Sequence, residues 1–211
     1  MEILCVPVGP LQANCYLVYD EERFACVIDP GGEPDRLTRL IQQKGLGVEA
    51  IFVTHGHFDH VEGVRGLEEN TGAPVYCSTG VVPVLSGEAG CSATGLPIPA
   101  LAPSAIHPVE DGSEILVGNL SVKVISTPGH TPWDLTYEIG GHLFTGDLVF
   151  YRSVGRTDFP GGDFPTLLES VRKLALRYPK TTPLHPGHMQ STTLGEELAF
   201  NPFLGGLKLR G

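Results

Sequence analysis

Long hydrophobic runs are absent from this sequence. Nowhere do about eighteen apolar residues follow one another, which is close to the minimum for a helix that crosses a membrane. The segment from Met1 to Gly9 also lacks the basic stretch followed by an apolar run that marks a secretory signal. We therefore expect a cytoplasmic protein that does not associate with a membrane.

Basic residues are scarce as well. The chain has 14 Lys and Arg against 24 Asp and Glu, a formal net charge of -10, and its basic residues do not cluster. Such a surface repels a phosphate backbone. The charge balance therefore predicts no nucleic-acid partner and disfavours a nuclease.

Two sequence patterns of reactive side chains are missing. The cysteines are odd in number, at five, and none form a C-x-x-C pair, which disfavours a disulfide framework or a cysteine zinc site. We expect reduced core thiols at Cys5, Cys15, Cys26, Cys77 and Cys91. No G-x-S-x-G elbow occurs, so a serine hydrolase has no support.

Apolar runs separated by turn signals predict mixed strands and helices. A chain of 211 residues with 41% hydrophobic content can bury one sizeable core, so we expect a single domain over residues 1–211. Strands are expected over Ile3–Val8, Cys15–Tyr19, Phe24–Ile28, Ala50–Thr54, Val75–Cys77, Ser121–Ser126, Leu135–Ile139 and His142–Phe144, the first three as an antiparallel meander. Helices are expected over Leu37–Lys44, Val61–Asn70 and Phe164–Tyr178. This order indicates two sheets packed face to face with helices outside.

The segment Ala89–Val109 has no charged residue and contains four prolines, which prevent regular structure over much of it. We expect a long loop. Such a loop is either a lid over a pocket or an ordinary buried connection.

The most specific pattern is His55-Gly56-His57-Phe58-Asp59-His60, which follows the predicted strand Ala50–Thr54. Alternation along an extended backbone places His55 and His57 on one side, where their imidazoles can share one metal ion. Asp59 and His60 follow as the chain turns into the next helix, so their side chains leave in another direction. They can therefore reach a neighbouring ion.

Two ions need more donors than this segment supplies. His130, Asp147 and His188 each lie in a turn-rich segment at the end of a later apolar run, where side chains can converge over one edge of the sheets. His185 competes with His188 because it is only three residues away. The remaining histidines are expected to be structural.

Arg156 lies in a glycine-rich segment just after Asp147. We expect its guanidinium to reach over the metals toward a substrate carboxylate. A structural ion pair with Asp158 or Asp163 is the alternative.

Together with the turn Asp29-Pro30-Gly31-Gly32, these motifs resemble the metallo-β-lactamase superfamily, and the likeness runs from the N-terminal strands to about Phe203. Within that superfamily, three segments are similar to the glyoxalase II-like branch, which hydrolyses thioesters. They are Gly9-Pro10-Leu11-Gln12-Ala13-Asn14-Cys15-Tyr16, Gly155-Arg156-Thr157-Asp158-Phe159-Pro160-Gly161-Gly162 and Asn201-Pro202-Phe203.

The resemblance implies an α+β fold, a four-layer αβ/βα sandwich of two mixed sheets with helices outside. It implies that His55, His57 and His130 bind one metal, that Asp59, His60 and His188 bind the other, and that Asp147 bridges them. Asp29 would support the site from behind the ligands or stabilise its own turn. Only Leu204–Gly211 follow the last motif, so we expect no C-terminal glutathione-binding helical domain.

This chain departs from the family pattern at two places beside the metals. Relatives commonly continue the His130 motif with Pro-Gly and then Ser or His, whereas this chain has Pro132-Trp133-Asp134. Where relatives commonly have Gly-His-Gly, it has Gly187-His188-Met189. Both changes leave the ligands in place and bear on substrate preference.

The resemblance implies a thioesterase that cleaves hydroxyacyl thioesters such as S-lactoylglutathione by attack of a hydroxide that bridges two divalent ions. Zinc is the expected metal, with iron or manganese as alternatives, and Asp59 and Asp147 are the expected catalytic residues. A thiolate departs without a dedicated general acid, so these residues suffice. The alternative is a mononuclear iron persulfide dioxygenase, which the segment Gly155–Phe159 also resembles.

Overall fold

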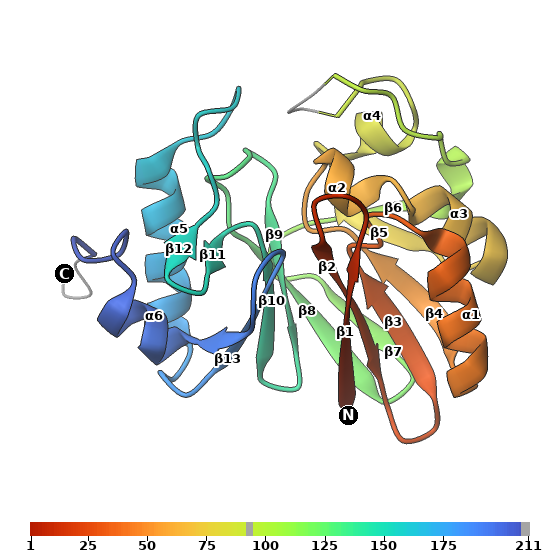
Figure 1. Cartoon of the computed structure of the whole chain (residues 1–211), viewed down its shortest axis with the longest axis horizontal. Helices are drawn as coiled ribbons and strands as arrows, with labels where there is room; N and C mark the ends of the chain where they lie inside the picture. The colour runs from red at the N-terminus through yellow and green to blue at the C-terminus, as the bar shows by residue number, and fades with distance from the viewer. Residues whose placement is uncertain (92–94, 208–211) are drawn as a thin grey trace.

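The first of two central sheets is built from the N-terminal half of the chain (Figure 1). The structure is a computed structural model that describes residues 1–91 and 95–207. Strand order is β1-β2-β3-β4-β5-β6, antiparallel from β1 to β3 and parallel from β3 to β6. The strands are β1 (Glu2–Val8), β2 (Ala13–Tyr19), β3 (Phe24–Ile28), β4 (Gly47–Phe52), β5 (Val75–Ser78) and β6 (Ile106–Val109). The predicted antiparallel meander of the first three strands is confirmed.

The second sheet is built from the C-terminal half and has the order β14-β13-β10-β9-β8-β7. Only the β10–β13 pair is parallel. Its strands are β7 (Glu114–Val117), β8 (Leu120–Ser126), β9 (Leu135–Ile139), β10 (His142–Gly146), β13 (Pro183–Pro186) and β14 (Thr192–Thr193), and the hairpin β11 (Val149–Phe150) and β12 (Ser153–Val154) is separate. Both sheets are therefore mixed.

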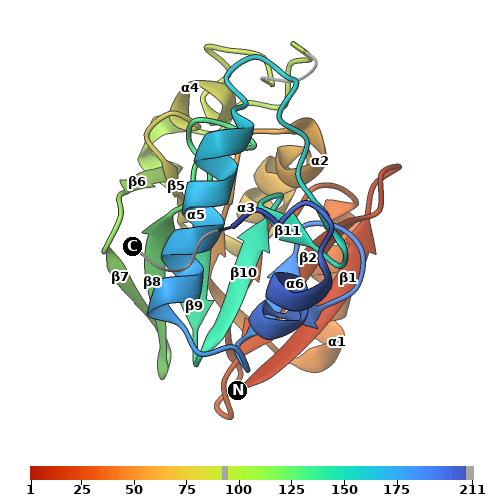
Figure 2. The same cartoon turned by 90° about the vertical axis from the view of Figure 1, so that its left-hand side faces the viewer.

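Helices cover the outer face of each sheet (Figures 1 and 2). The helices are α1 (Pro34–Lys44), α2 (Phe58–Val61), α3 (Val64–Thr71), α4 (Val82–Leu85), α5 (Phe164–Arg177) and α6 (Leu194–Phe200), with a 3₁₀ turn at Pro103–Ala105. α1 and α3 pack their apolar residues on the first sheet, and α5 packs on the second. The expected four-layer αβ/βα sandwich is confirmed.

The two sheets face each other through a buried cluster that includes Tyr16 and Phe52 from one sheet and Tyr137 and Phe144 from the other. Burying one large apolar side chain contributes about 1.5–3 kcal/mol. Tyr137 also donates a hydrogen bond of 2.8 Å to the carbonyl of Val53, just after β4. This contact fixes the end of β4 against the second sheet, where the next residues carry the predicted metal donors.

The predicted helix Val61–Asn70 corresponds to α3, and a separate short helix that was not predicted, α2, ends at Val61. The break occurs because the N–H of Gly63 donates to the carbonyl of Pro30, 3.0 Å away, rather than within a helix. The change matters for the site, because α2 begins at Phe58 and so includes Asp59 and His60.

The expectation of a loop over Ala89–Val109 is wrong at its C-terminal end. Ile106–Val109 is a strand, β6, which pairs in parallel with β5 at the edge of the first sheet. An edge strand tolerates Pro108 because one row of its backbone groups needs no partner strand. Residues 92–94 lie outside the described residues.

The prediction of core thiols is correct for four cysteines and wrong for Cys5, which is exposed on the edge strand β1. All five cysteines are free. Within the described ranges, no helix combines the length and apolar content that a membrane crossing requires.

Candidate metal centre

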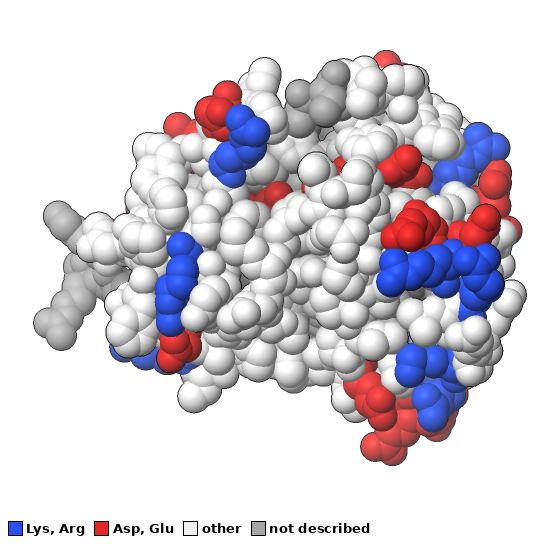
Figure 3. All heavy atoms as spheres, viewed as in Figure 1, with Lys and Arg blue, Asp and Glu red and all other residues white. Residues whose placement is uncertain are grey.

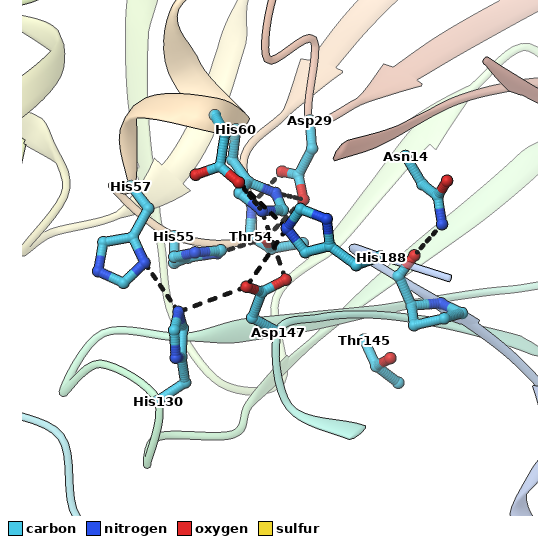
Figure 4. Close-up of polar contacts among 12 residues, drawn as sticks. Asn14, Asp29, Thr54, His55, His57, His60, His130, Thr145, Asp147 and His188 are labelled. Atoms are coloured by element: carbon cyan, nitrogen blue, oxygen red, sulfur yellow. Dashed lines mark hydrogen bonds and ion pairs between the residues drawn. The ribbon is translucent and has the colours of Figure 1, made fainter. Parts of the chain in front are cut away.

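The predicted donors lie together at the edge of the sandwich where β4, β8, β10 and β13 end (Figure 4). Six of them form two groups in which the candidate ligand atoms all lie within 4.8 Å of one another. The groups are His55, His57 and His130, and Asp59, His60 and His188. The segments that carry them are far apart in sequence, so the sandwich itself assembles the site.

The seventh donor, Asp147, lies between the two groups. Its Oδ2 atom is 3.6 Å from Nε2 of His130 and 3.7 Å from Nε2 of His188. Its Oδ1 atom is 3.4 Å from Nε2 of His60. One carboxylate thus faces both groups, which is the arrangement that a ligand shared by two ions requires.

Three buried polar atoms have no hydrogen-bond partner among the described residues: Nε2 of His55, Nε2 of His60 and Oδ1 of Asp147. A buried polar atom without a partner costs about 1–3 kcal/mol. All three atoms face the space between the two groups, and imidazole nitrogen and carboxylate oxygen are suitable ligands for zinc and similar ions. The residues therefore fit two divalent metal ions.

A hydrogen bond on the far side of the His130 ring directs its free nitrogen inward. Nδ1–H of His130 donates to the carbonyl oxygen of Arg156, 2.7 Å away, which leaves Nε2 without a proton. Nε2 of His130 is 2.8 Å from Nδ1 of His57. The two nitrogens are therefore close enough to bind one cation, which would take the place of the proton between them.

Asp29 supports both groups from behind. Its carboxylate accepts hydrogen bonds from Nδ1–H of His60 at 2.9 Å and from the backbone N–H and hydroxyl of Thr54 at 2.7 and 2.6 Å. The Thr54 hydroxyl in turn lies 3.0 Å from Nδ1 of His55 and accepts its proton. Asp29 also forms a candidate group with His55 and His60, but these bonds occupy its carboxylate, which is the arrangement expected of a residue that orients ligands.

The histidines of the first group are neutral at ordinary pH. Burial lowers the pKa of His57 to about 4, and the neighbouring His130 adds to the effect. Burial also lowers the pKa of His55 and of His130. A neutral imidazole is the form that binds a metal.

The second group has a strong negative field. Burial by itself would lower the pKa of His60, but the carboxylates of Asp147 and Asp29 outweigh it and raise that pKa well above the ordinary value. Burial opposes ionisation of Asp147, but the charge of the neighbouring His60 keeps the pKa of this carboxyl below the ordinary range. A cation bound here would replace the proton on His60.

Sequence reasoning did not assign roles to Asn14 and Tyr16, which hold the loop that carries His188. The side-chain amide of Asn14 donates to the carbonyls of Pro186 and Met189 at 3.0 and 2.8 Å, and the Tyr16 hydroxyl donates to Pro186 at 2.7 Å. An asparagine within an apolar strand is a sign of this role, because a buried amide must find hydrogen-bond partners, and Asn14 is buried in β2.

Gly187 brings this loop against the site. A Cβ atom on Gly187 would lie 2.2 Å from Oδ1 of Asp147 and 2.7 Å from Cε1 of His60. Any side chain here would therefore displace a candidate ligand.

His185, the competitor of His188, points elsewhere. Its Nδ1 atom is 3.0 Å from the Ser191 hydroxyl and its Nε2 atom is 2.9 Å from Nδ1 of His142. Its ring stacks on Phe144 at 4.8 Å between centroids. The geometry therefore favours His188.

A cleft of about 390 Å³ opens onto the donors. Its apolar walls come from Leu11, Phe58, Phe150, Val154 and Phe159, and the candidate ligands on its floor are His57, Asp59, His130, Asp147 and His188. Arg156 is the one Lys or Arg among the described residues that line it. Elsewhere on the face in Figure 3, the basic side chains that are drawn stand in small groups beside acidic ones.

The Arg156 guanidinium donates to both carboxylate oxygens of Asp158, at 2.7 and 2.6 Å. It also lies over the Phe159 ring, 3.7 Å from the centroid. The ion pair considered as the alternative thus exists, with Asp158 and not with Asp163. Arg156 nevertheless lines the cleft with its side chain 55% exposed, so its expected contact with substrate stays a prediction.

Comparison with known proteins agrees with this geometry. The model of the metallo-beta-lactamase superfamily matches residues 8–188. The chain is 35% identical to hydroxyacylglutathione hydrolase GloC of Haemophilus influenzae, with 97% of this chain and 98% of that protein covered.

Two solved structures are similar over nearly their whole length. The BLEG-1 B3 metallo-beta-lactamase has a TM-score of 0.90 and 35% identity, covering 97% of this chain and 100% of that one. TTHA1623, solved in a di-iron-bound form, has a TM-score of 0.83 and 42% identity, covering 95% and 100%. With two groups of donors around one central carboxylate, the chain belongs to the metallo-β-lactamase superfamily, whose members are metal-dependent hydrolases.

Proposed function

We propose that this protein is a thioester hydrolase that uses two divalent ions, with zinc as the expected metal. The observation that carries the proposal is the position of Asp147, whose carboxylate faces both donor groups. His55, His57 and His130 would hold one ion, Asp59, His60 and His188 the other, and Asp147 both. The di-iron form of the similar TTHA1623 supports a site for two metals.

Two bound divalent ions supply a hydroxide nucleophile at neutral pH, by lowering the pKa of water to about 7, and polarise the substrate carbonyl. Asp59 orients the attacking water. The Oδ2 atom of Asp59 lies 3.1 Å from Nε2 of His188. Burial alone would raise the pKa of Asp59, but the contact with His188 keeps that pKa below the ordinary value. The carboxylate is therefore ionised and can accept a hydrogen bond.

The residues around the cleft favour a thioester over an amide. An amine leaving group must be protonated, whereas a thiolate, with a parent pKa of about 8.5, departs without a proton donor. Among the described residues that line the cleft there is no Lys, Tyr or Cys to act as a general acid, and each lining histidine is a candidate ligand. The name of the relative GloC supports a hydroxyacyl thioester substrate.

The carrier thiol is the less constrained part of the substrate. Glutathione has two carboxylates, and Arg156, already paired with Asp158, is the one Lys or Arg on the described cleft walls. Remote contacts with a carrier assist the reaction when they form. We expect weak discrimination between glutathione and smaller thiols.

Metal analysis and parallel assays test the proposal. Protein purified without added metal and then given excess zinc, iron or manganese should hold two ions per chain. It should hydrolyse thioesters faster than it oxidises persulfides or opens β-lactams. A stoichiometry that stays at one ion, with persulfide oxidation as the main activity, would replace the proposal with the mononuclear dioxygenase, which needs only part of the donor set.

The carrier is tested by comparing kcat/KM for S-lactoylglutathione with that for the same acyl group on N-acetylcysteine. The ratio should stay below about a hundredfold, roughly 2.7 kcal/mol of differential transition-state binding. A larger preference for glutathione would mean that a specific carrier pocket exists.

A further inference from the structure

A second cavity, of about 330 Å³, lies beside the metal-centre cleft. It is separate from the first and is lined by parts of the 80–90 segment, the loop after His130 and the loop that carries Phe159. The lining residues are Gly56, Gly80, Val81, Pro83, Val84, Ala89, Gly90, Thr131, Pro132, Trp133 and Pro160. We call it the Trp133 pocket.

Two residues that line the Trp133 pocket are sequence neighbours of histidines in the first donor group. Gly56 lies between His55 and His57 in sequence, and Thr131 follows His130. Phe159 lines the cleft, and its ring centroid is 5.9 Å from that of His57. The following residue in the sequence, Pro160, lines the Trp133 pocket. The two spaces are therefore neighbours across the loops that carry His57 and His130.

The indole of Trp133 packs against the protein backbone. A Cβ atom on Gly80 would lie 2.1 Å from Cδ2 of Trp133, so the ring packs directly on the backbone of Gly80. The Ser78 hydroxyl donates to the Trp133 backbone carbonyl at 2.8 Å, and the backbone N–H of Trp133 donates to the Thr131 hydroxyl at 3.2 Å. These bonds fix the backbone that carries the ring, and the ring itself packs on Gly80 although the residue is 51% exposed.

The hydrogen bonds of the buried Asp134 fix the same loop. Its Oδ2 atom accepts from the backbone N–H of Thr131 at 2.7 Å, and its Oδ1 atom accepts from the Thr131 hydroxyl. Trp133 and Asp134, which form one of the two departures from the family pattern, thus act together, since Asp134 shapes the loop that presents Trp133.

The residues that line the Trp133 pocket determine which kind of chemical group it can bind. None of the residues that line the pocket carries a charge, and most are aliphatic, proline or aromatic. A charged group would lose its hydration without gaining a partner there, whereas an apolar group is favoured. Cavities of this size are large enough for part of a small molecule.

We propose that the Trp133 pocket binds an uncharged, apolar substituent of the substrate, an aliphatic chain or an aromatic ring attached to the thioester. This proposal rests on the proposed function, because the pocket adjoins the donors at which the carbonyl would react. The substituent belongs to either the acyl group or the thiol, and the pocket recognises the same chemistry in both.

Trp133 is the single tryptophan of the chain, so intrinsic fluorescence reports on this pocket without any turnover. Metal-loaded protein is titrated with hexanoate and phenylacetate, which carry an apolar group, and with acetate, which shares the carboxylate but is too short. The two larger acids should change the intensity or wavelength of the emission in a saturable way, and acetate should not. Equal responses to all three acids, or no response to any, would overturn the proposal.

The kinetic arm uses two series of thioesters on a small neutral carrier. One series lengthens the acyl group from acetyl to hexanoyl, and the other lengthens the thiol substituent over the same range. In one series kcat/KM should rise by at least about tenfold, because apolar pockets discriminate by this order per group. The series that responds identifies the side of the substrate that enters the pocket. Flat profiles in both series would contradict the proposal.

Matched variants locate the effect. Ala89→Glu places a carboxylate at an exposed position that lines the pocket and keeps Trp133 as the reporter. Ala102→Glu makes the same change at an exposed position that does not line it. Only Ala89→Glu should remove the fluorescence response and the chain-length advantage.

Two outcomes separate this inference from the proposed function. Saturable fluorescence responses without thioester hydrolysis would sustain the pocket and refute the thioesterase. Thioester hydrolysis with no chain-length dependence, and equal behaviour of the two variants, would sustain the thioesterase and refute the pocket.

Discussion

Nδ1 of His60 lies 2.9 Å from Oδ2 of Asp29, with the two side chains 0% and 3% exposed. The same carboxylate oxygen accepts from the Thr54 hydroxyl, which also contacts His55. One buried aspartate therefore contacts a candidate ligand of one donor group directly and a candidate ligand of the other through Thr54.

Asp29→Asn should weaken metal binding by about 10–100-fold, as is usual when a partner behind a ligand is lost. The amide offers one acceptor oxygen where the carboxylate offers two, so the contacts of His60 and Thr54 cannot all be kept. Competition with a chromogenic chelator measures the change. Asp35→Asn, which removes the same charge from the exposed first turn of α1, is the control and should leave affinity unchanged.

Asp147→Ala should lower kcat/KM by about 10³-fold or more, some 4 kcal/mol, and should loosen both ions. His185→Ala is its counterpart, because His185 contacts Ser191 and His142 and should leave the metal content unchanged. Elemental analysis after dialysis distinguishes the two variants. Equal metal loss from His185→Ala and His188→Ala would leave the choice of His188 without support.

Arg156→Ala should lower kcat/KM by up to about fivefold for anionic thioesters and leave neutral ones unchanged, since an exposed ionic contact is worth about 1 kcal/mol or less. The variant keeps the backbone carbonyl that accepts from His130. Asp158→Asn should have the opposite effect, because it releases the guanidinium. If Arg156→Ala alters no anionic substrate, the arginine is only a structural partner of Asp158.

Glu197→Ala should destabilise the fold by about 3–5 kcal/mol, the usual cost of removing one partner of a buried ion pair. Its side chain is fully buried and accepts from the N–H and guanidinium of Arg152 at 2.8 and 3.0 Å, from Thr192 at 2.7 Å and from Asn201 at 2.9 Å. Glu196→Ala is the matched control.

The Glu196 side chain pairs with the same arginine but is 52% exposed, so Glu196→Ala should cost less than about 1 kcal/mol. Urea unfolding measures both variants. Similar midpoints for the two would mean that the buried network around Glu197 contributes little to stability.

Stability should also fall between about pH 6.5 and pH 4, partly because of His185. Burial lowers the pKa of His185 in the folded protein to about 4, with a smaller contribution from His142. The unfolded chain, with an ordinary pKa near 6.5, binds a proton first, so acid favours unfolding across this window. His185→Phe should reduce the slope of unfolding free energy against pH there. An unchanged slope would mean that His185 does not stay neutral.

The local patterns of the sequence predicted β1–β5, β8–β10 and the helices α1, α3 and α5, and they singled out the candidate donors, but they did not predict β7 or β13. His55 to His60 stand within a single turn-forming segment, so their types and spacing were sufficient to predict two neighbouring sites. The same local reasoning failed for β6, whose partner strand β5 lies almost thirty residues away, and for Cys5, whose exposure depends on its edge position.

Residue patterns left His185 and His188 as competitors, and only the tertiary structure separates them. His188 rather than His185 faces Asp147 because Asn14 and Tyr16, more than 160 residues earlier, fix the intervening loop. Trp133 lines a pocket because Gly80, on a different loop, leaves room for its ring. Hydrophobic and helical periodicity are properties of neighbouring residues, whereas these contacts form only when the two sheets close on each other, and so no local pattern encodes them.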